Sequence, residues 1–204
     1  PISIPLSHIF NLSITQGIFP SALKTSRIVP IHKAGSTSIC DNYRPIALQH
    51  TISKILEKTV AIQLDNHLER NNLITQHQFG FQKCTTTEHN LLHVINYIST
   101  ALNNGEYCIG IFLDLKKAFD TVQHSILLKK LEHYGIKGTA LAWFTSYLSN
   151  RKQLVDIDGN HSSTQNIDIS VMQGSILGPT LFKIEINDLV YASQLAATLF
   201  ADDT

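Results

Sequence analysis

YCIGIFLDL at residues 107–115 and LAATLFADDT at residues 195–204 are the stretches that decide the fold. The first is rich in β-branched and other apolar side chains, and it is predicted to form a buried strand that ends at Asp114. The second is predicted to form a strand that runs into a turn at Asp202 and Asp203. Each apolar strand therefore ends in a carboxylate.

Two buried strands of this kind can bring their terminal carboxylates together at one edge of a sheet. Like charges placed side by side in a buried site cost free energy unless a cation neutralises them. Mg²⁺ takes oxygen ligands, typically one or two carboxylates together with substrate phosphates. Two ions about 3.5–4 Å apart could stabilise both the attacking and the leaving oxygen of phosphoryl transfer. The pattern therefore predicts a metal-dependent phosphoryl-transfer site.

The two adjacent aspartates are not expected to be equivalent. Successive residues of a strand face opposite sides of the sheet, so only one of them can share a face with Asp114. We predict that Asp202 is the closer metal ligand and that Asp203 supplies charge or a looser contact.

The composition is that of a folded globular chain without a strong charge bias. The 204 residues are 43% hydrophobic and 16% charged, with a formal net charge of zero. This length suffices for one domain or two tightly joined subdomains, and the composition argues against disorder. No apolar run is long enough to span a bilayer. The three separated cysteines favour a reducing, intracellular compartment.

Helices and strands are predicted to mix without strict alternation, which favours an α+β fold. Helices are predicted over residues 8–20, 51–69, 85–105, 124–135, 140–150 and 178–190, and strands over 26–33, 107–115, 151–157, 169–175 and 195–200. In the second helix, the predicted buried face holds Ile52, Ile55, Leu56, Ile62 and Leu68. Thr85 and Glu88 have the spacing of a capping box, and Pro30 suggests an edge position for its strand.

Several motifs together resemble one protein family. FLDLKKAFDTV (112–122), QGSILGPTLFKIEINDL (173–189) and FADD (200–203) resemble, in this order and spacing, successive palm motifs of reverse transcriptases. The resemblance is closest to the enzymes of non-LTR retrotransposons. SRIVPIHKAG, NYRPIAL and QFGFQKCTTTEHNLL upstream look like the fingers motifs of that family. The resemblance extends over essentially the whole chain.

The resemblance implies the fingers and palm of a right-hand polymerase, with the palm an antiparallel sheet packed on helices. Fingers would occupy roughly residues 1–105, and the palm, with inserted fingers helices, residues 106–204. The family continues beyond its paired aspartates into a thumb. Because position 1 is Pro and no such continuation is present, the chain is expected to be a fragment in which the thumb is missing.

The resemblance also assigns the metal site. Asp114, Asp202 and Asp203 would be the catalytic metal ligands, with the backbone carbonyl of Leu115 nearby. Two Mg²⁺ ions would be the cofactors, with Mn²⁺ as the alternative.

The same resemblance assigns a nucleotide site. Phe119 would stand beneath the incoming sugar as a steric gate against the 2′-hydroxyl, and Gln173 and Gly174 would line the nucleotide pocket. Lys33 and Arg44 would hold the triphosphate, because Lys offers a point charge and Arg a planar fork. Taken one at a time, Phe119 would be read as a core residue and the two cations as surface charges.

One departure concerns the loop before Gln173. The family commonly has Gly-x-Pro there, whereas this chain has Ser170, Val171 and Met172, which is expected to loosen the loop.

The function implied by the resemblance is RNA-directed DNA polymerisation. The partners would be an RNA template, a DNA primer and deoxynucleoside triphosphates, with no membrane, and a retrotransposon enzyme would act in the nucleus. Two alternatives stay open: a group II intron-type reverse transcriptase or maturase, and an inactive truncated remnant of a retroelement.

Overall fold

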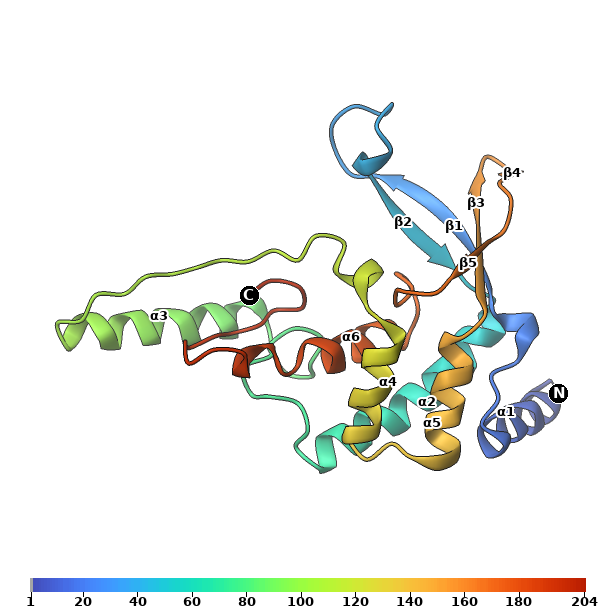
Figure 1. The fold of residues 1–204 in the computed structure, drawn as a ribbon, viewed down its shortest axis with the longest axis horizontal. Coiled ribbons are helices and arrows are strands. Elements are labelled where there is room, and N and C mark those ends of the chain that lie inside the picture. The colour runs from blue at the N-terminus through green and yellow to red at the C-terminus, as the bar shows by residue number, and fades with distance from the viewer. Residues whose placement is uncertain (1) are drawn as a thin grey trace.

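The computed structural model describes residues 2–204 and sets a small sheet against a cluster of helices (Figure 1). The strands are β1 (Thr25–His32), β2 (Tyr43–Leu48), β3 (Arg151–Ile157), β4 (Asn160–His161) and β5 (Gln165–Ile167). They run in the order β2-β1-β3-β4, and β5 also pairs with β3. β1 is antiparallel to β2 and parallel to β3. The sheet thus draws strands from both sides of residue 105, and the division into fingers and palm there stays a prediction.

The position of Pro30 within β1 follows from the register of the sheet. Pro30 lies opposite Pro45 of β2, and the pairing of β1 with β3 covers only Thr25–Ile28. At Pro30, β1 is therefore a local edge, where a residue without an amide hydrogen breaks no ladder.

All six expected helices are present, and with the sheet they confirm the α+β class. They are α1 (Ser3–Gln16), α2 (Thr51–Arg70), α3 (Thr87–Asn103), α4 (His124–His133), α5 (Gly138–Leu148) and α6 (Gly178–Ile186). Helix α1 begins and ends several residues before the predicted range 8–20, and α6 ends four residues early. Short 3₁₀ turns are η1 (Ser21–Leu23), η2 (Cys40–Asn42), η3 (Ala118–Thr121) and η4 (Leu189–Tyr191). Among residues 2–204, no helix combines the length and apolarity needed to cross a membrane.

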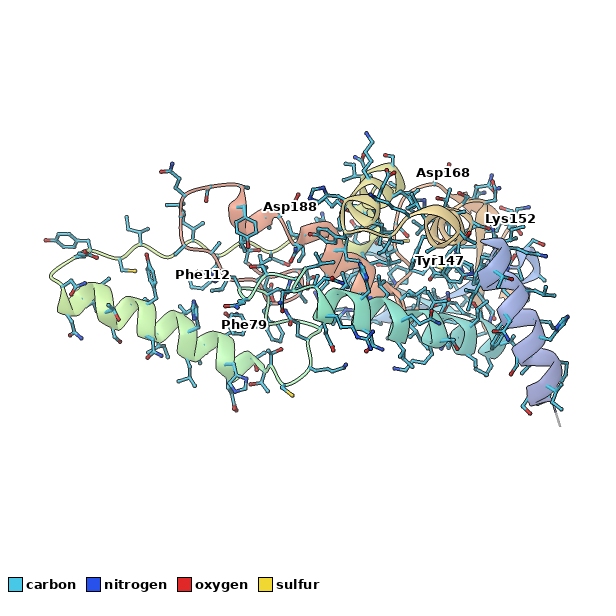
Figure 2. All side chains as sticks on the ribbon, turned by 90° about the horizontal axis from the view of Figure 1, so that it is seen from below. Phe79, Phe112, Tyr147, Lys152, Asp168 and Asp188 are labelled. Atoms are coloured by element: carbon cyan, nitrogen blue, oxygen red, sulfur yellow. The ribbon has the colours of Figure 1, made fainter. Side chains whose placement is uncertain are left out.

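The core lies where α2, α4, α5 and α6 meet. Its fully buried members include Leu56, Leu127, Leu131, Leu181 and Ile184. Beside them Trp143 stacks on Tyr147 with ring centroids 5.5 Å apart, and the Phe19 ring meets both edge-on. Figure 2 shows Tyr147 within this crowded region.

The predicted buried face of α2 is correct for Leu56 and Leu68 but wrong for its three isoleucines. Ile52, Ile55 and Ile62 are exposed by 40, 45 and 50%. The buried residues of α2 are Ser53, Leu56, Glu57, Ala61, Leu64 and Leu68. These follow the helical period more closely than the isoleucines do. The polar members Ser53 and Glu57 tolerate burial because they are hydrogen-bonded there.

The cap of α3 lies one residue later than expected. Thr86, not Thr85, accepts a hydrogen bond from the amide of His89 at 3.3 Å, and the His89 ring accepts one from the amide of Thr86. Thr85 is engaged elsewhere, because its hydroxyl donates to the Phe79 carbonyl at 2.6 Å. The helix ends before Gly105, as expected, with that glycine at φ 75°.

The predicted buried strand at residues 107–115 is also wrong. Residues 106–113 are irregular, and Tyr107, Ile109 and Phe112 are exposed by 101, 87 and 87%. Within residues 2–204, only the end of this segment, at Leu113–Leu115, pairs with another part of the chain, so most of its apolar side chains stay exposed. In Figures 1 and 2 the segment runs beside α3, and Phe112 lies far from the crowded core around Tyr147.

Two further strands of the expected antiparallel palm sheet are replaced by isolated bridges. Residues 169–175, predicted as a return strand, form an irregular loop, and β5 pairs with β3 in their place. In the stretch 195–200, Leu199 makes a bridge with Gln78. Residues 170–175 form hydrogen bonds with Phe119 and Val122 in one part of the chain and with Ala47 in another, so they do not form a ladder with one partner strand.

The helical core should carry most of the stability. Leu131→Ala is expected to lower the free energy of unfolding by about 2–5 kcal/mol, because this side chain is fully buried. Leu91→Ala on α3 is the matched control, since Leu91 is 59% exposed, and should change it by no more than about 0.5 kcal/mol. Urea unfolding measures both. Equal effects would contradict this placement of the core.

Candidate functional site

Asp114 and Asp203 face each other across a short antiparallel bridge. The Leu115 amide donates to the Asp202 carbonyl at 3.4 Å, and the Thr204 amide donates to the Leu113 carbonyl at 2.9 Å. This pattern makes the two aspartates a non-hydrogen-bonded pair, whose Cα atoms are about 4.5 Å apart and whose side chains share one face. The expected meeting of carboxylates from residues 107–115 and 195–204 is thus present at the backbone.

The turn at residues 200–203 explains which aspartate meets Asp114. Phe200 and Asp203 exchange backbone hydrogen bonds of 2.8 and 3.1 Å, so Ala201 and Asp202 form the tip. Ala201 has φ 57°, as a tight hairpin requires. Asp202 therefore lies at the tip, and Asp203 is in register with Asp114. The assignment of Asp202 as the closer ligand stays a prediction that this register does not favour.

A segment before α3 holds this turn in place. The Phe79 amide donates a hydrogen bond to the Leu199 carbonyl at 2.7 Å. The buried Gln78 side chain accepts hydrogen bonds from the amides of Gly80 and Ala201, at 2.7 and 3.2 Å. A Cβ on Gly80 would overlap the Ala201 amide nitrogen and lie 2.8 Å from its Cα. Only glycine lets the two backbones approach this closely.

Carboxylate oxygens are the ligands that a hard divalent cation prefers, so the pair Asp114 and Asp203 fits such an ion in chemistry. Both side chains are exposed to solvent. In the part of the chain that the structure describes, no three His, Cys, Asp or Glu side chains gather closely enough to hold a metal ion. Two of the three predicted ligands are therefore paired, while Asp202 stands apart at the tip.

The loop that carries Gln173 and Gly174 lies between β2 and η3. The Gln173 carbonyl accepts a hydrogen bond from the Ala47 amide at 2.9 Å. Gly174 has φ 109°, and a Cβ there would lie 2.9 Å from the Ala47 carbonyl oxygen. The backbone at Gly174 therefore packs directly against the backbone of β2. The side-chain oxygen of Gln173 is buried without a hydrogen-bond partner among the described residues.

Met172 anchors this loop, contrary to the expected loosening. Its side chain is buried with Ile28 and Ala47, and the Ser26 hydroxyl lies 3.0 Å from its sulfur. The thioether thus fills a gap between the loop and the sheet, which suits a flexible apolar side chain.

Phe119 is brought next to the same loop. Its carbonyl accepts a hydrogen bond from the Val171 amide at 2.8 Å. Its half-buried ring stacks on Phe182 with centroids 4.7 Å apart, and Phe81 meets it edge-on. Phe119 thus has the packing of a core residue, and its role as a steric gate stays a prediction. Partial burial raises the pKa of the neighbouring Asp120 carboxyl, while Lys117 acts in the opposite direction.

Lys33 and Arg44 are exposed residues of the β1–β2 hairpin and its connection. The tip of the hairpin reaches the segment that follows Asp114, because Lys117 Nζ lies 3.1 Å from a carboxylate oxygen of Asp41. An exposed ion pair of this kind contributes little stability, but it places the hairpin tip beside residues 114–119.

Pattern reasoning missed three residues that hold the site: Gln78, Gly80 and Glu57. Glu57 is fully buried and accepts a hydrogen bond from the Ile176 amide at 3.0 Å. A glycine within the quoted QFGF motif was a usable signal for Gly80. Nothing in the apolar pattern of α2 marked Glu57, because a charged residue is ordinarily assigned to the surface.

Comparison with known proteins connects this geometry to a family. The sequence model described as "Reverse transcriptase (RNA-dependent DNA polymerase)" matches residues 31–204. The chain is 36% identical over 208 residues to the RNA-directed DNA polymerase from mobile element jockey of Drosophila melanogaster, covering 98% of this chain and 23% of that protein. It is 34% identical to a probable RNA-directed DNA polymerase from transposon X-element of the same organism, covering 97% of this chain and 22% of that protein. The chain thus spans about a fifth of these relatives.

Solved structures support the fold. Apo telomerase from Candida tropicalis, truncated from its C-terminal domain, aligns with a TM-score of 0.62 over 98% of this chain and 48% of its own, at 11% identity. Telomerase from Candida albicans in complex with a fragment of telomeric RNA gives a TM-score of 0.61 over 91% of this chain and 39% of its own, at 16% identity. At these identities the likeness concerns the fold alone.

Gly80→Ala should displace the turn that carries the paired aspartates. The added methyl overlaps the backbone of Ala201, which cannot move without breaking the bond to Gln78. Amide hydrogen exchange at Ala201 is expected to speed up at least about tenfold, which corresponds to a loss of roughly 1.4 kcal/mol of local stability.

The matched control is Gly110→Ala, because a Cβ there would meet only the ring of the exposed Phe112. Unchanged exchange at Ala201 in Gly80→Ala would show that the close approach of the two backbones is not what holds the turn.

Proposed function

This chain belongs to the reverse transcriptase family, and we propose that it carries the polymerase site of a non-LTR retrotransposon enzyme. The reaction is the templated transfer of a deoxynucleotide to a primer 3′-hydroxyl, with release of pyrophosphate. RNA is the proposed template and DNA the product strand. The observation that carries the proposal is the register that sets Asp114 opposite Asp203, together with the hydrogen bond from Val171 to Phe119 that ties the loop of Gln173 and Gly174 to the segment following Asp114.

The relatives come from mobile elements, which supports the hypothesis of a retrotransposon enzyme. The jockey and X-element proteins are RNA-directed DNA polymerases of mobile elements, and a type-1 retrotransposable element R2 protein of Popillia japonica is 29% identical over 186 residues. This agreement favours a retrotransposon enzyme over a group II intron-type enzyme. Primer extension by the wild-type polypeptide distinguishes an active enzyme from an inactive truncated remnant of a retroelement.

The proposed metal ligands are Asp114, Asp202 and Asp203, together with the carbonyl of Leu115. Asp114 and Asp203 already share one face of the bridge, which suits a hard cation such as Mg²⁺ or Mn²⁺. Such ions, when bound, supply stabilisation of the charge that develops on the entering and leaving oxygens.

The remaining residues of the proposed site act by positioning the nucleotide. Lys33 and Arg44 bind the triphosphate through charge, and Gln173 and Gly174 orient the base and sugar from the loop. Phe119 excludes a 2′-hydroxyl by the bulk of its ring. The contact between Asp41 and Lys117 supports this grouping, because it brings the β1–β2 hairpin over the segment that holds Phe119.

Asp114→Asn and Asp202→Asn should each reduce primer extension at least about 100-fold in the natural polypeptide that carries this chain. Asn keeps the shape of the side chain but loses the charge that stabilises a bound cation, and two tenfold steps correspond to roughly 2.7 kcal/mol. Primer–template affinity, measured by filter binding at one fixed salt concentration, should change little, because the strands are held mainly through phosphates.

Asp158→Asn is the matched control. Asp158 has φ 50° in the β3–β4 turn, a conformation that Asn also tolerates, and the residue is exposed. It should leave extension intact. Extension that persists in Asp114→Asn would refute the metal role, and a wild-type polypeptide that binds primer–template without extending it would support the remnant.

Phe119→Val should raise the use of ribonucleotides relative to deoxynucleotides, because a smaller side chain leaves room for the 2′-hydroxyl. Phe182→Leu is the control for lost packing, since it removes the ring that stacks on Phe119 but leaves the Phe119 side chain itself unchanged. The ratio of kcat/KM for the two nucleotide classes measures the effect. The same ratio in wild type and Phe119→Val would leave Phe119 as a core residue only.

A further inference from the structure

The loop over residues 170–177 has no secondary structure of its own, yet it carries the proposed nucleotide-contacting residues. Contacts on two sides hold its first half. The Ala47 amide donates to the Gln173 carbonyl at 2.9 Å, and the Val171 amide donates to the Phe119 carbonyl at 2.8 Å. Its second half leads into α6 at Gly178. The backbone of this half is held by hydrogen bonds to a side chain of another helix.

That side chain is Glu57 of α2, which is fully buried. One of its carboxylate oxygens accepts hydrogen bonds from the amides of Ile176 and Leu177, at 3.0 and 3.5 Å. The other accepts one from the Ser53 hydroxyl at 3.2 Å. Leu177, the residue just before α6, has no side chain able to cap the helix, and the Ser175 hydroxyl instead accepts a hydrogen bond from the Gly178 amide at 2.9 Å. The carboxylate therefore fixes, from a distant part of the chain, the two residues that lead into α6.

A buried carboxylate must be compensated, and the surroundings of Glu57 include a buried cation. Arg151 is 2% exposed; its guanidinium lies 4.7 Å from the centre of the Tyr147 ring and donates to the Tyr147 carbonyl at 3.0 Å. Burial lowers the pKa of Arg151, and attraction to Glu57 acts in the opposite direction. Burial, together with the charge of Glu57, raises the pKa of Tyr147 well above its ordinary value. The carboxylate thus sits in a low-dielectric cluster, where its hydrogen bonds are strong.

A second acidic residue on α2 shows what a purely structural contact looks like. Asp65 accepts a hydrogen bond from the Thr180 hydroxyl at 3.0 Å, so it also joins α2 to α6. It bonds to a side chain within the helix, beyond the loop. Glu57 instead bonds to the two backbone amides that follow directly on Ser175.

We propose that Glu57 is a positioning residue for the nucleotide: by fixing the amides of Ile176 and Leu177, it sets the place of Gln173 and Gly174. This inference rests on the proposed polymerase function. It gives α2, which contributes none of the predicted site residues, an indirect part in substrate binding, through the loop. Loss of the charge on Glu57 should free the second half of the loop, so that Gly174 and the Gln173 side chain can shift even though the Ala47 amide still holds the Gln173 carbonyl.

The test compares Glu57→Gln with Asp65→Asn in the natural polypeptide that carries this chain. Glu57→Gln should raise KM for the deoxynucleoside triphosphate about tenfold with a smaller change in kcat, and amide exchange at Ile176 and Leu177 should speed up. Asp65→Asn should lower stability without either change, because its contact does not reach the loop.

The outcomes separate the inference from the proposed function. An active wild type whose Glu57→Gln variant keeps its KM, or shifts it no more than Asp65→Asn does, would overturn the positioning role while leaving the polymerase assignment intact. A wild type that does not extend primers would count against the proposed function. Exchange at Ile176 and Leu177 would then decide the role of Glu57, unchanged exchange overturning it and faster exchange supporting it.

Discussion

Close approach of one backbone to another, at Gly80 and at Gly174, holds the candidate site together. Gly80 lies against Ala201 in the turn of the paired aspartates, and Gly174 lies against the Ala47 carbonyl of β2. Both contacts join segments that are far apart in the sequence, and neither leaves room for a Cβ. The relative placement of the carboxylates, the loop of Gln173 and the hairpin sheet depends on them, because little regular secondary structure connects these parts.

The two halves of the site differ in how firmly they are held. The loop of Gln173 is held by Met172 and Glu57, both of which are buried. The pair of Asp114 and Asp203 lies at the end of an exposed irregular segment and rests on a few backbone hydrogen bonds. Regions with few buried contacts open at lower free energy than the core. The carboxylates are therefore expected to be the less stable half, and the loop of Gln173 the more firmly held one.

The helices, strands β1 and β3 and the order of motifs could be predicted from the sequence because they depend on local signals, whereas β2 was not predicted. A glycine at φ 75°, Gly105, follows the end of α3, and Asp158 with Gly159 turns β3 into β4. The errors arose where distant partners decide the outcome. Glu57 is buried because its hydrogen-bond donors come from residues about 120 positions later, and the apolar run at residues 107–115 lacks a covering partner among the described residues. The register that chooses Asp203 over Asp202 depends on the turn geometry, which strand alternation alone could not supply.

The parallel pairing of β1 with β3 has a consequence for how the chain folds as it is made. β1 and β2 form a local hairpin, but residues 25–28 must wait for residues 152–155 before the sheet is complete. At a ribosomal rate of about 5–20 residues per second, that interval lasts roughly 6–25 s. Throughout it, one edge of β1 offers unpaired amides and carbonyls to any other extended chain nearby. Pro30, which has no amide hydrogen to offer, shortens the edge available for such mispairing during synthesis.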